Sequence, residues 1–205
     1  MINAEIIALF ISVVVTFFVI IDPLGSLPIF MGLTRKESKE KKIQLALQAV
    51  LVSFSVILAF ALFGNQILGF LDISLPSLQA SGGLLLLLVS LELLTGKDSH
   101  PTNKSEVSIA LVPLGTPLLA GPGAIAATII FVRKAESSIE LATIIFGLII
   151  VHLVLFLLLR FSIPITKLLG VGGISILTRL AGLLLAAIAV QMIVGAIAEF
   201  VKIYS

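Results

Sequence analysis

The chain of 205 residues contains no cysteine and no tryptophan, one tyrosine and two histidines, and only 12% of its residues are charged. The absence of cysteine excludes disulfides, thiol catalysis and cysteine metal sites. The histidines, His100 and His152, are too few for a histidine-rich metal site. The sequence has no basic stripe interleaved with aromatic residues, so it gives no indication of nucleic-acid binding. No cluster of His, Asp and Glu resembles an active site either, so we expect neither an enzyme nor a bound cofactor.

The residues that are present are mostly apolar: 59% are hydrophobic and the mean hydropathy is +1.26. A soluble protein needs more polar surface than this, whereas a bilayer-spanning helix needs roughly 20 apolar residues. Backbone groups in lipid must bond within the segment, so long apolar runs predict helices. These runs lie at residues 5–33, 43–71, 75–95, 106–132, 141–161 and 174–200. The sequence therefore predicts an all-α protein in contact with membrane lipid, with about six transmembrane helices.

The first run is predicted to be a retained span rather than a signal peptide. No Lys or Arg precedes residues 6–21, and the run ends in Asp-Pro instead of a small-residue cleavage site.

The basic residues predict the orientation. With six spans, ten of the 13 Lys and Arg residues fall on one side of the membrane. They are Arg35, Lys36, Lys39, Lys41, Lys42, Lys97, Lys104, Arg160, Lys167 and Arg179, against Arg133, Lys134 and Lys202 on the other side. Because basic loops stay in the cytoplasm, both termini are predicted to face outward.

The two halves of the chain resemble each other at an offset of 99 residues. Pro23 then matches Pro122, and Gly83-Leu84-Leu85-Leu86 matches Gly182-Leu183-Leu184-Leu185. The further matches are Glu37-Ser38 with Glu136-Ser137, Gly96 with Gly195, and Glu92 with Gln191. Three spans in each half would place the halves in opposite orientations, as in many secondary transporters. We therefore predict repeats at 1–98 and 99–205, the alternative being chance similarity between apolar segments.

The candidate site is where two spans contain proline and glycine near their middle. The first run is too long for one untilted span, and we expect its helix, the first, to break around 22–25. The fourth helix carries an equivalent break without an acid. Freed amides attract anions and freed carbonyls attract cations, so the two breaks would form a small polar site, although simple kinks are the alternative. Its candidate residues are Asp22, Pro23, Leu24, Gly25, Ser26, Gly121, Pro122, Gly123 and Ala124.

Asp22 is the candidate coupling residue, as a sodium ligand or a proton carrier, because intramembrane acids are commonly functional. The weaker site candidates are Thr16, Thr116, Thr128, Glu92 and Gln191. Each threonine could instead bond to its own helix backbone, Glu92 is expected near the membrane interface, and Gln191 could join two helices. His152 is expected to be a packing histidine.

The pattern Asp-Pro-x-Gly-x-x-Pro-x-Phe at residues 22–30 resembles a signature of the MarC-related integral membrane proteins, and Gly121-Pro122-Gly123-Ala124-Ile125 resembles their second signature. The resemblance implies a prokaryotic cytoplasmic-membrane protein. Some members of this family are regarded as transporters of small neutral amino acids, such as glycine and alanine, driven by ion gradients.

The function we expect is therefore secondary transport of such amino acids by alternating access, with Na⁺ or H⁺ as the coupling ion. The alternatives are a passive channel or facilitator, an exporter of metabolites or drugs, and an assembly or regulatory protein without a substrate. Substrate identity, coupling ion, direction and oligomeric state do not follow from the sequence.

Overall fold

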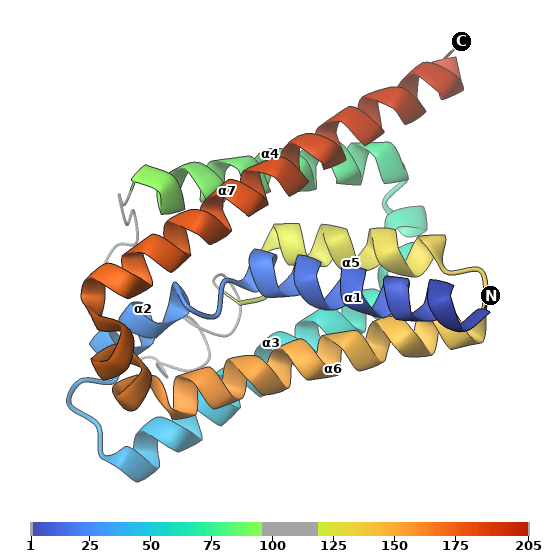
Figure 1. Ribbon diagram of the computed structural model, residues 1–205. Coiled ribbons are helices and arrows are strands. Elements are labelled where there is room, and N and C mark those ends of the chain that lie inside the picture. Colours follow the sequence, from blue (N-terminus) through green and yellow to red (C-terminus); the bar gives the residue numbers. More distant parts are fainter. Residues whose placement is uncertain (1, 96–118, 205) are drawn as a thin grey trace.

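The computed structural model describes residues 2–95 and 119–204, which are almost entirely helical and contain no strand (Figure 1). The helices are α1 (Ile2–Ile21), α2 (Ser26–Leu33), α3 (Lys39–Phe70), α4 (Leu75–Thr95), α5 (Pro122–Lys134), α6 (Ser138–Arg160) and α7 (Ser162–Tyr204). The prediction of an all-α protein is thereby confirmed for the described residues.

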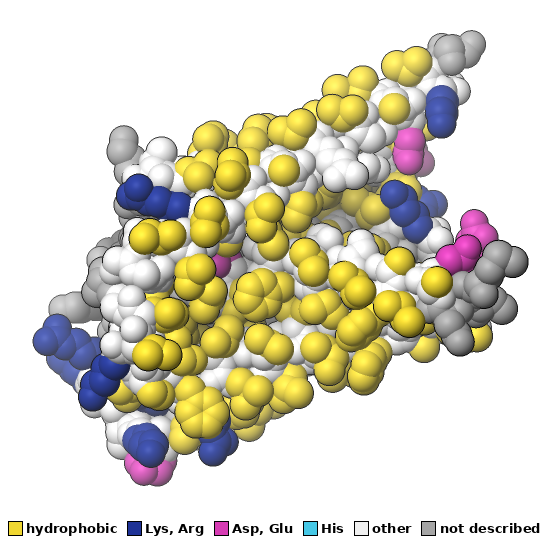
Figure 2. Space-filling model, viewed as in Figure 1, with side chains coloured by type: hydrophobic (Ala, Val, Ile, Leu, Met, Phe, Trp, Pro, Cys, Tyr) yellow, Lys and Arg dark blue, Asp and Glu magenta, His cyan; other side chains and the backbone are white. Residues whose placement is uncertain are grey.

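Five stretches within these helices are long and apolar enough to cross a membrane. They are Ala4–Ile21, Lys39–Phe70, Leu75–Thr95, Ser138–Arg160 and Gly172–Ile203. Hydrophobic side chains cover the visible face of these helices, as a surface in contact with lipid requires (Figure 2). The chain is therefore an integral, multi-pass membrane protein. α5 has only 13 residues, and most of the predicted run 106–132 before it lies outside the described residues.

The helices form three layers (Figure 1). α4 packs along α7 on one side, and α3 packs against α6 on the other. α1, α2 and α5 lie between these pairs, where α1 contacts α6 and α5 contacts both α3 and α4. The short and interrupted helices are thus held at the centre of the molecule by four longer ones.

The interruption predicted in the first span is confirmed. α1 ends at Ile21 and α2 begins at Ser26, which leaves four residues of non-helical chain near the middle of the molecule. A second irregularity occurs in α7, where Gly170 adopts a φ of 66° and kinks the helix. Glycine reaches this left-handed conformation without a steric penalty.

Several local features recur at the 99-residue offset. The Ser38 side chain caps α3 by accepting a hydrogen bond from the Lys41 amide at 3.2 Å. The Ser137 side chain caps α6 by accepting one from the Glu140 amide, also at 3.2 Å. Ser38 and Ser137 are 99 positions apart, and so are Lys41 and Glu140. The two helices therefore begin in the same way.

The crossing of α4 and α7 recurs in the same manner. A Cβ atom on Gly83 would lie 2.9 Å from both the Ala189 carbonyl oxygen and the Ile193 side chain. A Cβ atom on Gly182 would lie 3.3 Å from the Ser90 carbonyl oxygen and 3.4 Å from the Leu94 side chain. Every partner in the second set is the residue 99 positions away from a partner in the first. Each helix therefore places its glycine against the same part of the other.

His152 is a satisfied packing residue, as expected. Its Nε2 lies 3.3 Å from the Ser53 Oγ, and its Nδ1 lies 2.8 Å from the Leu148 carbonyl oxygen. The ring also packs edge-on against Phe54, with centroids 5.2 Å apart. Ser53 and His152 are themselves 99 positions apart, so this bond joins equivalent positions of α3 and α6.

Basic side chains gather at the end of the molecule that carries the α2–α3 loop (Figure 2). Arg35 and Lys36 are exposed in this loop, and Arg160 is exposed at the end of α6 nearby. The opposite end carries Arg133, Lys134 and Lys202. The predicted division of charge between the two ends is therefore present in the described residues.

Candidate functional site

The break between α1 and α2 begins at Asp22. Its amide donates to the Phe18 carbonyl at 3.2 Å, which completes the last turn of α1. Its φ of 43° is in the left-handed region, which aspartate tolerates better than most residues and which ends a helix. Pro23 follows, and its missing N–H prevents the helix from continuing. The local sequence thus determines where α1 stops.

The Asp22 carboxylate is only half satisfied. Its Oδ1 accepts a hydrogen bond from the Gly25 amide at 3.1 Å, while Oδ2 is buried without a partner. The whole residue is 8% exposed. A buried acceptor with no donor is costly, and more so when it carries charge. Oδ2 is therefore the atom in this region that is best placed to bind a cation or an N–H group.

Because Gly25 has no side chain, the Asp22 carboxylate can occupy the space beside it. A Cβ atom at this position would collide with the Asp22 Oδ2 and would lie 3.2 Å from the Thr178 Cγ2 of α7. Glycine is therefore required here by close approach. Thr178 also becomes part of the surroundings of the break, which the sequence analysis did not predict.

The amides that begin α2 are occupied within the break. Ser26 donates to the Asp22 carbonyl from its amide and from its hydroxyl, both at 3.0 Å. The Leu27 amide donates to the Leu24 carbonyl at 3.2 Å. Together with the Gly25–Asp22 bond, these contacts leave little anion-binding capacity at the start of α2.

The start of α5 differs in this respect. Gly121 is extended, with φ −64° and ψ 163°, and its carbonyl accepts from the Ile125 amide at 3.1 Å. Pro122 is the first helical residue and has no N–H. The amides of Gly123 and Ala124 have no acceptor among the described residues. Free amides at a helix start, aligned with the helix dipole, attract anions.

The helix that ends at the first break and the helix that begins at Pro122 are in contact. α1 contacts α5, and Phe17 packs against Phe131 with ring centroids 5.9 Å apart. Ile21, Ala120 and Ala124 belong to one buried cluster. A buried carboxylate oxygen and two amides without an acceptor among the described residues thus belong to the central layer of the molecule.

The weaker sequence candidates are placed less favourably. The Thr128 hydroxyl donates to the Ala124 carbonyl of its own helix at 2.7 Å, and Thr16 is half-buried on α1. Glu92 is half-buried near the end of α4, whereas Gln191 is exposed on α7. Thr116 lies outside the described residues. Among the residues that the structure describes, no group of acidic or histidine side chains could hold a metal ion by itself.

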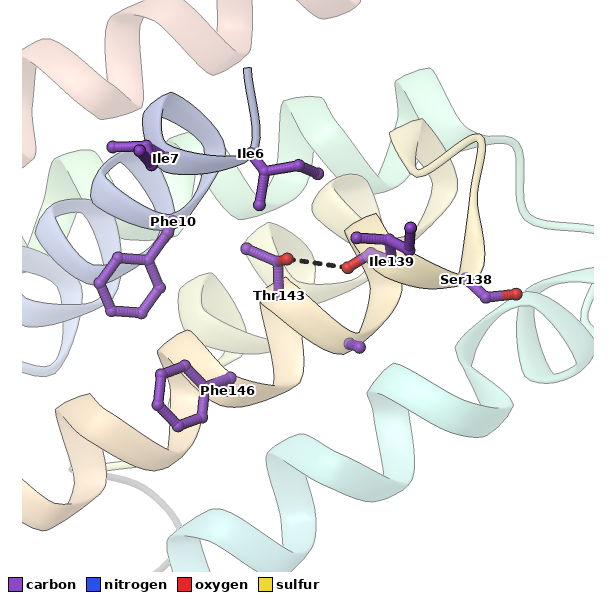
Figure 3. A pocket seen from close by; sticks show the side chains of 8 residues that line it. Ile6, Ile7, Phe10, Ser138, Ile139, Thr143 and Phe146 are labelled. Carbon is purple, nitrogen blue, oxygen red and sulfur yellow. Dashed lines mark hydrogen bonds between the residues drawn. The ribbon is translucent and has the colours of Figure 1, made fainter. Parts of the chain in front are cut away.

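An apolar hollow on the described surface lies elsewhere. A groove of about 560 Å³ opens between α1 and α6, lined by Ile6, Phe10, Ile139 and Phe146 among others (Figure 3). The Thr143 hydroxyl beside it donates to the Ile139 carbonyl at 2.8 Å. The groove is therefore lined mainly by apolar side chains, and its place near the start of α1 separates it from Asp22.

Gln79 of α4 is a second polar residue that the sequence analysis missed. It is 7% exposed, and its buried Oε1 has no hydrogen-bond partner in the part of the chain that the structure describes. Its Nε2 lies against Gly195 of α7, 2.6 Å from where a Cβ atom would be. The repeat supplied a signal for both missed residues, because Gln79 and Thr178 are polar and 99 positions apart.

Comparison with known proteins gives a family match over nearly the whole chain. Residues 7–201 match the family described as "MarC family integral membrane protein". A UPF0056 membrane protein of Methanocaldococcus jannaschii is 38% identical over 187 residues, covering 88% of this chain and 91% of its own. The UPF0056 membrane protein YvbG of Bacillus subtilis is 32% identical over 193 residues, covering 89% of this chain and 91% of its own. No solved structure matches the chain.

Proposed function

We propose that this chain, which belongs to the MarC family of integral membrane proteins, is a secondary transporter of small neutral amino acids of the glycine and alanine class. The observation that carries the proposal is the pairing of opposite charges at the two breaks. Among the described residues, the buried Asp22 Oδ2 lacks a partner at the α1–α2 break, and the Gly123 and Ala124 amides at the start of α5 have no acceptor. The amides can bind the carboxylate of a zwitterion, its ammonium can meet the carbonyls at the end of α1, and Oδ2 remains for a coupling ion.

The substrate is oriented by this pairing. Its carboxylate meets the Gly123 and Ala124 amides, because the Gly25 and Ser26 amides already bond to Asp22. Its ammonium lies on the Asp22 side, near the carbonyls of the last turn of α1. Asp22 and Thr178 fill the space beside Gly25, and Leu86 fills the space beside Gly123, so the close packing favours a substrate with little or no side chain.

Asp22 couples transport to an ion gradient in this proposal. Its unpaired Oδ2 binds Na⁺ or carries a proton, since both require an acceptor that is otherwise unsatisfied. No resident cofactor is required.

Alternating access would use the two halves, 1–98 and 99–205, as inverted repeats. Three observations favour this arrangement: the Ser38 and Ser137 caps, the matched contacts of Gly83 and Gly182, and the Ser53–His152 bond between equivalent positions. A bond between equivalent residues is expected where a pseudo-twofold axis passes through the molecule.

The proposed orientation places the α2–α3 loop in the cytoplasm and both termini outside a prokaryotic cytoplasmic membrane. The concentration of Lys and Arg at the loop end supports it.

Uptake of radiolabelled glycine into proteoliposomes tests the function, first with an inward sodium gradient and then with a proton gradient. We expect accumulation above equilibrium under one gradient, and loss of that accumulation in Asp22→Asn. The matched control is Asp72→Asn, because Asp72 is an exposed turn residue with a φ of 52° that asparagine also tolerates.

The other outcomes are informative. Equilibration without accumulation would indicate a facilitator, and gradient-driven loss of preloaded substrate would indicate an exporter. Absence of glycine and alanine movement by folded protein would contradict the substrate assignment. Accumulation that is unchanged in Asp22→Asn would contradict the coupling role.

A further inference from the structure

The two interrupted regions pack against their neighbouring long helices in different registers. α5 lies along α4 with Gly123 against Leu86 and Ala126 against Gly82. In the other half, Gly25 lies against Thr178 of α7. The 99-residue offset makes Gly25 equivalent to Ala124 and Thr178 equivalent to Gln79. Identical packing in both halves would therefore place Gln79 opposite Ala124.

The packing register of α5 on α4 differs from that of the α1–α2 break on α7 by about six residues, or ~9 Å along a helix. Leu86, and not Gln79, lies beside the start of α5. A second pair of equivalents agrees with this difference. Leu185, the equivalent of Leu86, shares its buried cluster with Val19 of α1, whereas Leu24, the equivalent of Gly123, packs against another cluster. The two halves are thus alike in sequence and unlike in this one interface.

The crossing of α4 and α7 shows no such difference. Gly83 and Gly182 face equivalent partners, so the central pair of long helices is symmetric while the packing of the interrupted regions on it is not. A molecule with two alike halves has a second conformation of similar energy, in which each half adopts the register of the other. The α4–α7 crossing is unchanged by that exchange.

Gln79 is the residue whose surroundings this exchange explains. Its carboxamide is buried with an unpaired Oε1, which is costly unless another state supplies a partner. In the exchanged state it lies at the start of α5, as Thr178 lies at Gly25 in the present one. The free amides of Gly123 and Ala124 are there, together with any substrate carboxylate that they hold.

We infer that Gln79 is a second substrate-binding residue, which contacts the bound amino acid only in the alternate register of α5 on α4. This inference rests on the proposed transport function. The Gln79 Nε2 donates to the substrate carboxylate, and its Oε1 accepts from the substrate ammonium. Thr178 of α7 contacts the substrate in the same way at the α1–α2 break in the present register. In each of the two registers, one polar side chain from α4 or α7 therefore reaches the substrate.

Cysteine cross-linking in native membranes tests the inference without requiring transport, and the natural chain contains no cysteine. Gln79→Cys with Ala124→Cys, and Leu27→Cys with Ala181→Cys, join positions that meet only after the exchange. The control is Leu93→Cys with Gly182→Cys, because a Cβ on Gly182 would lie 3.0 Å from the Leu93 Cβ. A disulfide needs Cβ atoms about 4 Å apart, so the control pair closes in both states with a small adjustment.

We expect both test pairs to close under mild oxidation, more slowly than the control. Failure of both pairs while the control closes would overturn the inference. Closure of Leu27–Ala181 alone would retain the register exchange and remove Gln79 from the site.

Uptake by Gln79→Leu provides the second measurement. We expect a loss of about tenfold or more, with unchanged yield of folded protein and unchanged control cross-linking. Leucine removes the unpaired oxygen, so a merely structural Gln79 would tolerate this change; full uptake would therefore overturn the binding role. If the unsubstituted protein moves neither glycine nor alanine, the proposed function fails, while the cross-links still decide the inferred contact.

Discussion

At the scale of single residues, the break depends on Asp22 acting in two ways. Its backbone ends α1 in the left-handed conformation, and its Oδ1 holds the Gly25 amide. These local bonds fix the side chain in place and leave Oδ2 without a partner. The residue is thus oriented by the chain before any ligand binds, which lowers the entropic cost of binding.

Gly25→Ala should test how closely the carboxylate is confined. The added methyl group would displace Oδ2 and press on Thr178, so we expect uptake to fall by about tenfold, or ~1.4 kcal/mol of lost interaction. Gly32→Ala is the matched control, because nothing lies within 4 Å of a Cβ on this exposed α2 glycine. Equal uptake by the two variants in proteoliposomes would contradict the proposed confinement.

Ser53→Ala should affect stability and not transport. It removes the 3.3 Å contact to the His152 Nε2 and leaves that atom buried, at a cost of about 1 kcal/mol. Thermal unfolding in detergent should show the loss, whereas exposed Ser55→Ala should not. A changed pH profile of uptake in Ser53→Ala would instead indicate that His152 carries protons.

Residues of the break could be predicted from sequence because proline, glycine and aspartate act locally. Thr178 and Gln79 could not be recognised in this way, since their relevance comes from which helix packs beside them. A polar residue in an apolar run has many structural explanations. Only the repeat offset distinguishes these two, and it does so once the contacts of Gly25 are known.

At the scale of helices, α4 and α7 form the most closely packed pair. Gly83 and Gly182 allow backbone carbonyls to approach, as small residues do at helix interfaces in membranes. Apolar composition predicted both helices but not their contact, because an apolar run does not specify its neighbour. The interruption of the first span was predicted from its length, whereas the kink at Gly170 was not.

Gly83→Val should weaken the α4–α7 crossing. Its side chain would overlap the Ala189 carbonyl and the Ile193 side chain, at an expected cost of about 1–3 kcal/mol. Gly69→Val, on an exposed glycine with nothing within 4 Å, should cost less than about 0.5 kcal/mol. Thermal unfolding of the two variants in the same detergent compares them. Similar midpoints would show that the crossing tolerates separation.

At the scale of the whole molecule, Lys and Arg gather toward two ends, and hydrophobic side chains cover most of the visible face between them (Figure 2). The predicted number of spans is met in part: five stretches are long enough, and α5 supplies a shorter sixth element. The sequence predicts such a layout because bilayer thickness fixes span length. Composition alone does not determine which end faces the cytoplasm.

Single cysteines should reveal the orientation. We expect Glu136→Cys to react with a membrane-impermeant maleimide in intact cells, and Lys36→Cys to react only after the membrane is permeabilised. Both positions are exposed and lie at opposite ends of the molecule. The reverse pattern would invert the proposed topology.

Asp22 is the only acidic side chain that is buried among the described residues, and its equivalent in the second half is Gly121. In the proposed transport cycle this carboxylate binds one monovalent cation, so a complete cycle with a neutral substrate would move a single elementary charge. At 100 mV that charge supplies about 2.3 kcal/mol, which sustains a concentration ratio of roughly 50. The proposed carrier would therefore be electrogenic and of modest accumulating power, and its reversal potential should shift by about 60 mV for each tenfold change in substrate ratio.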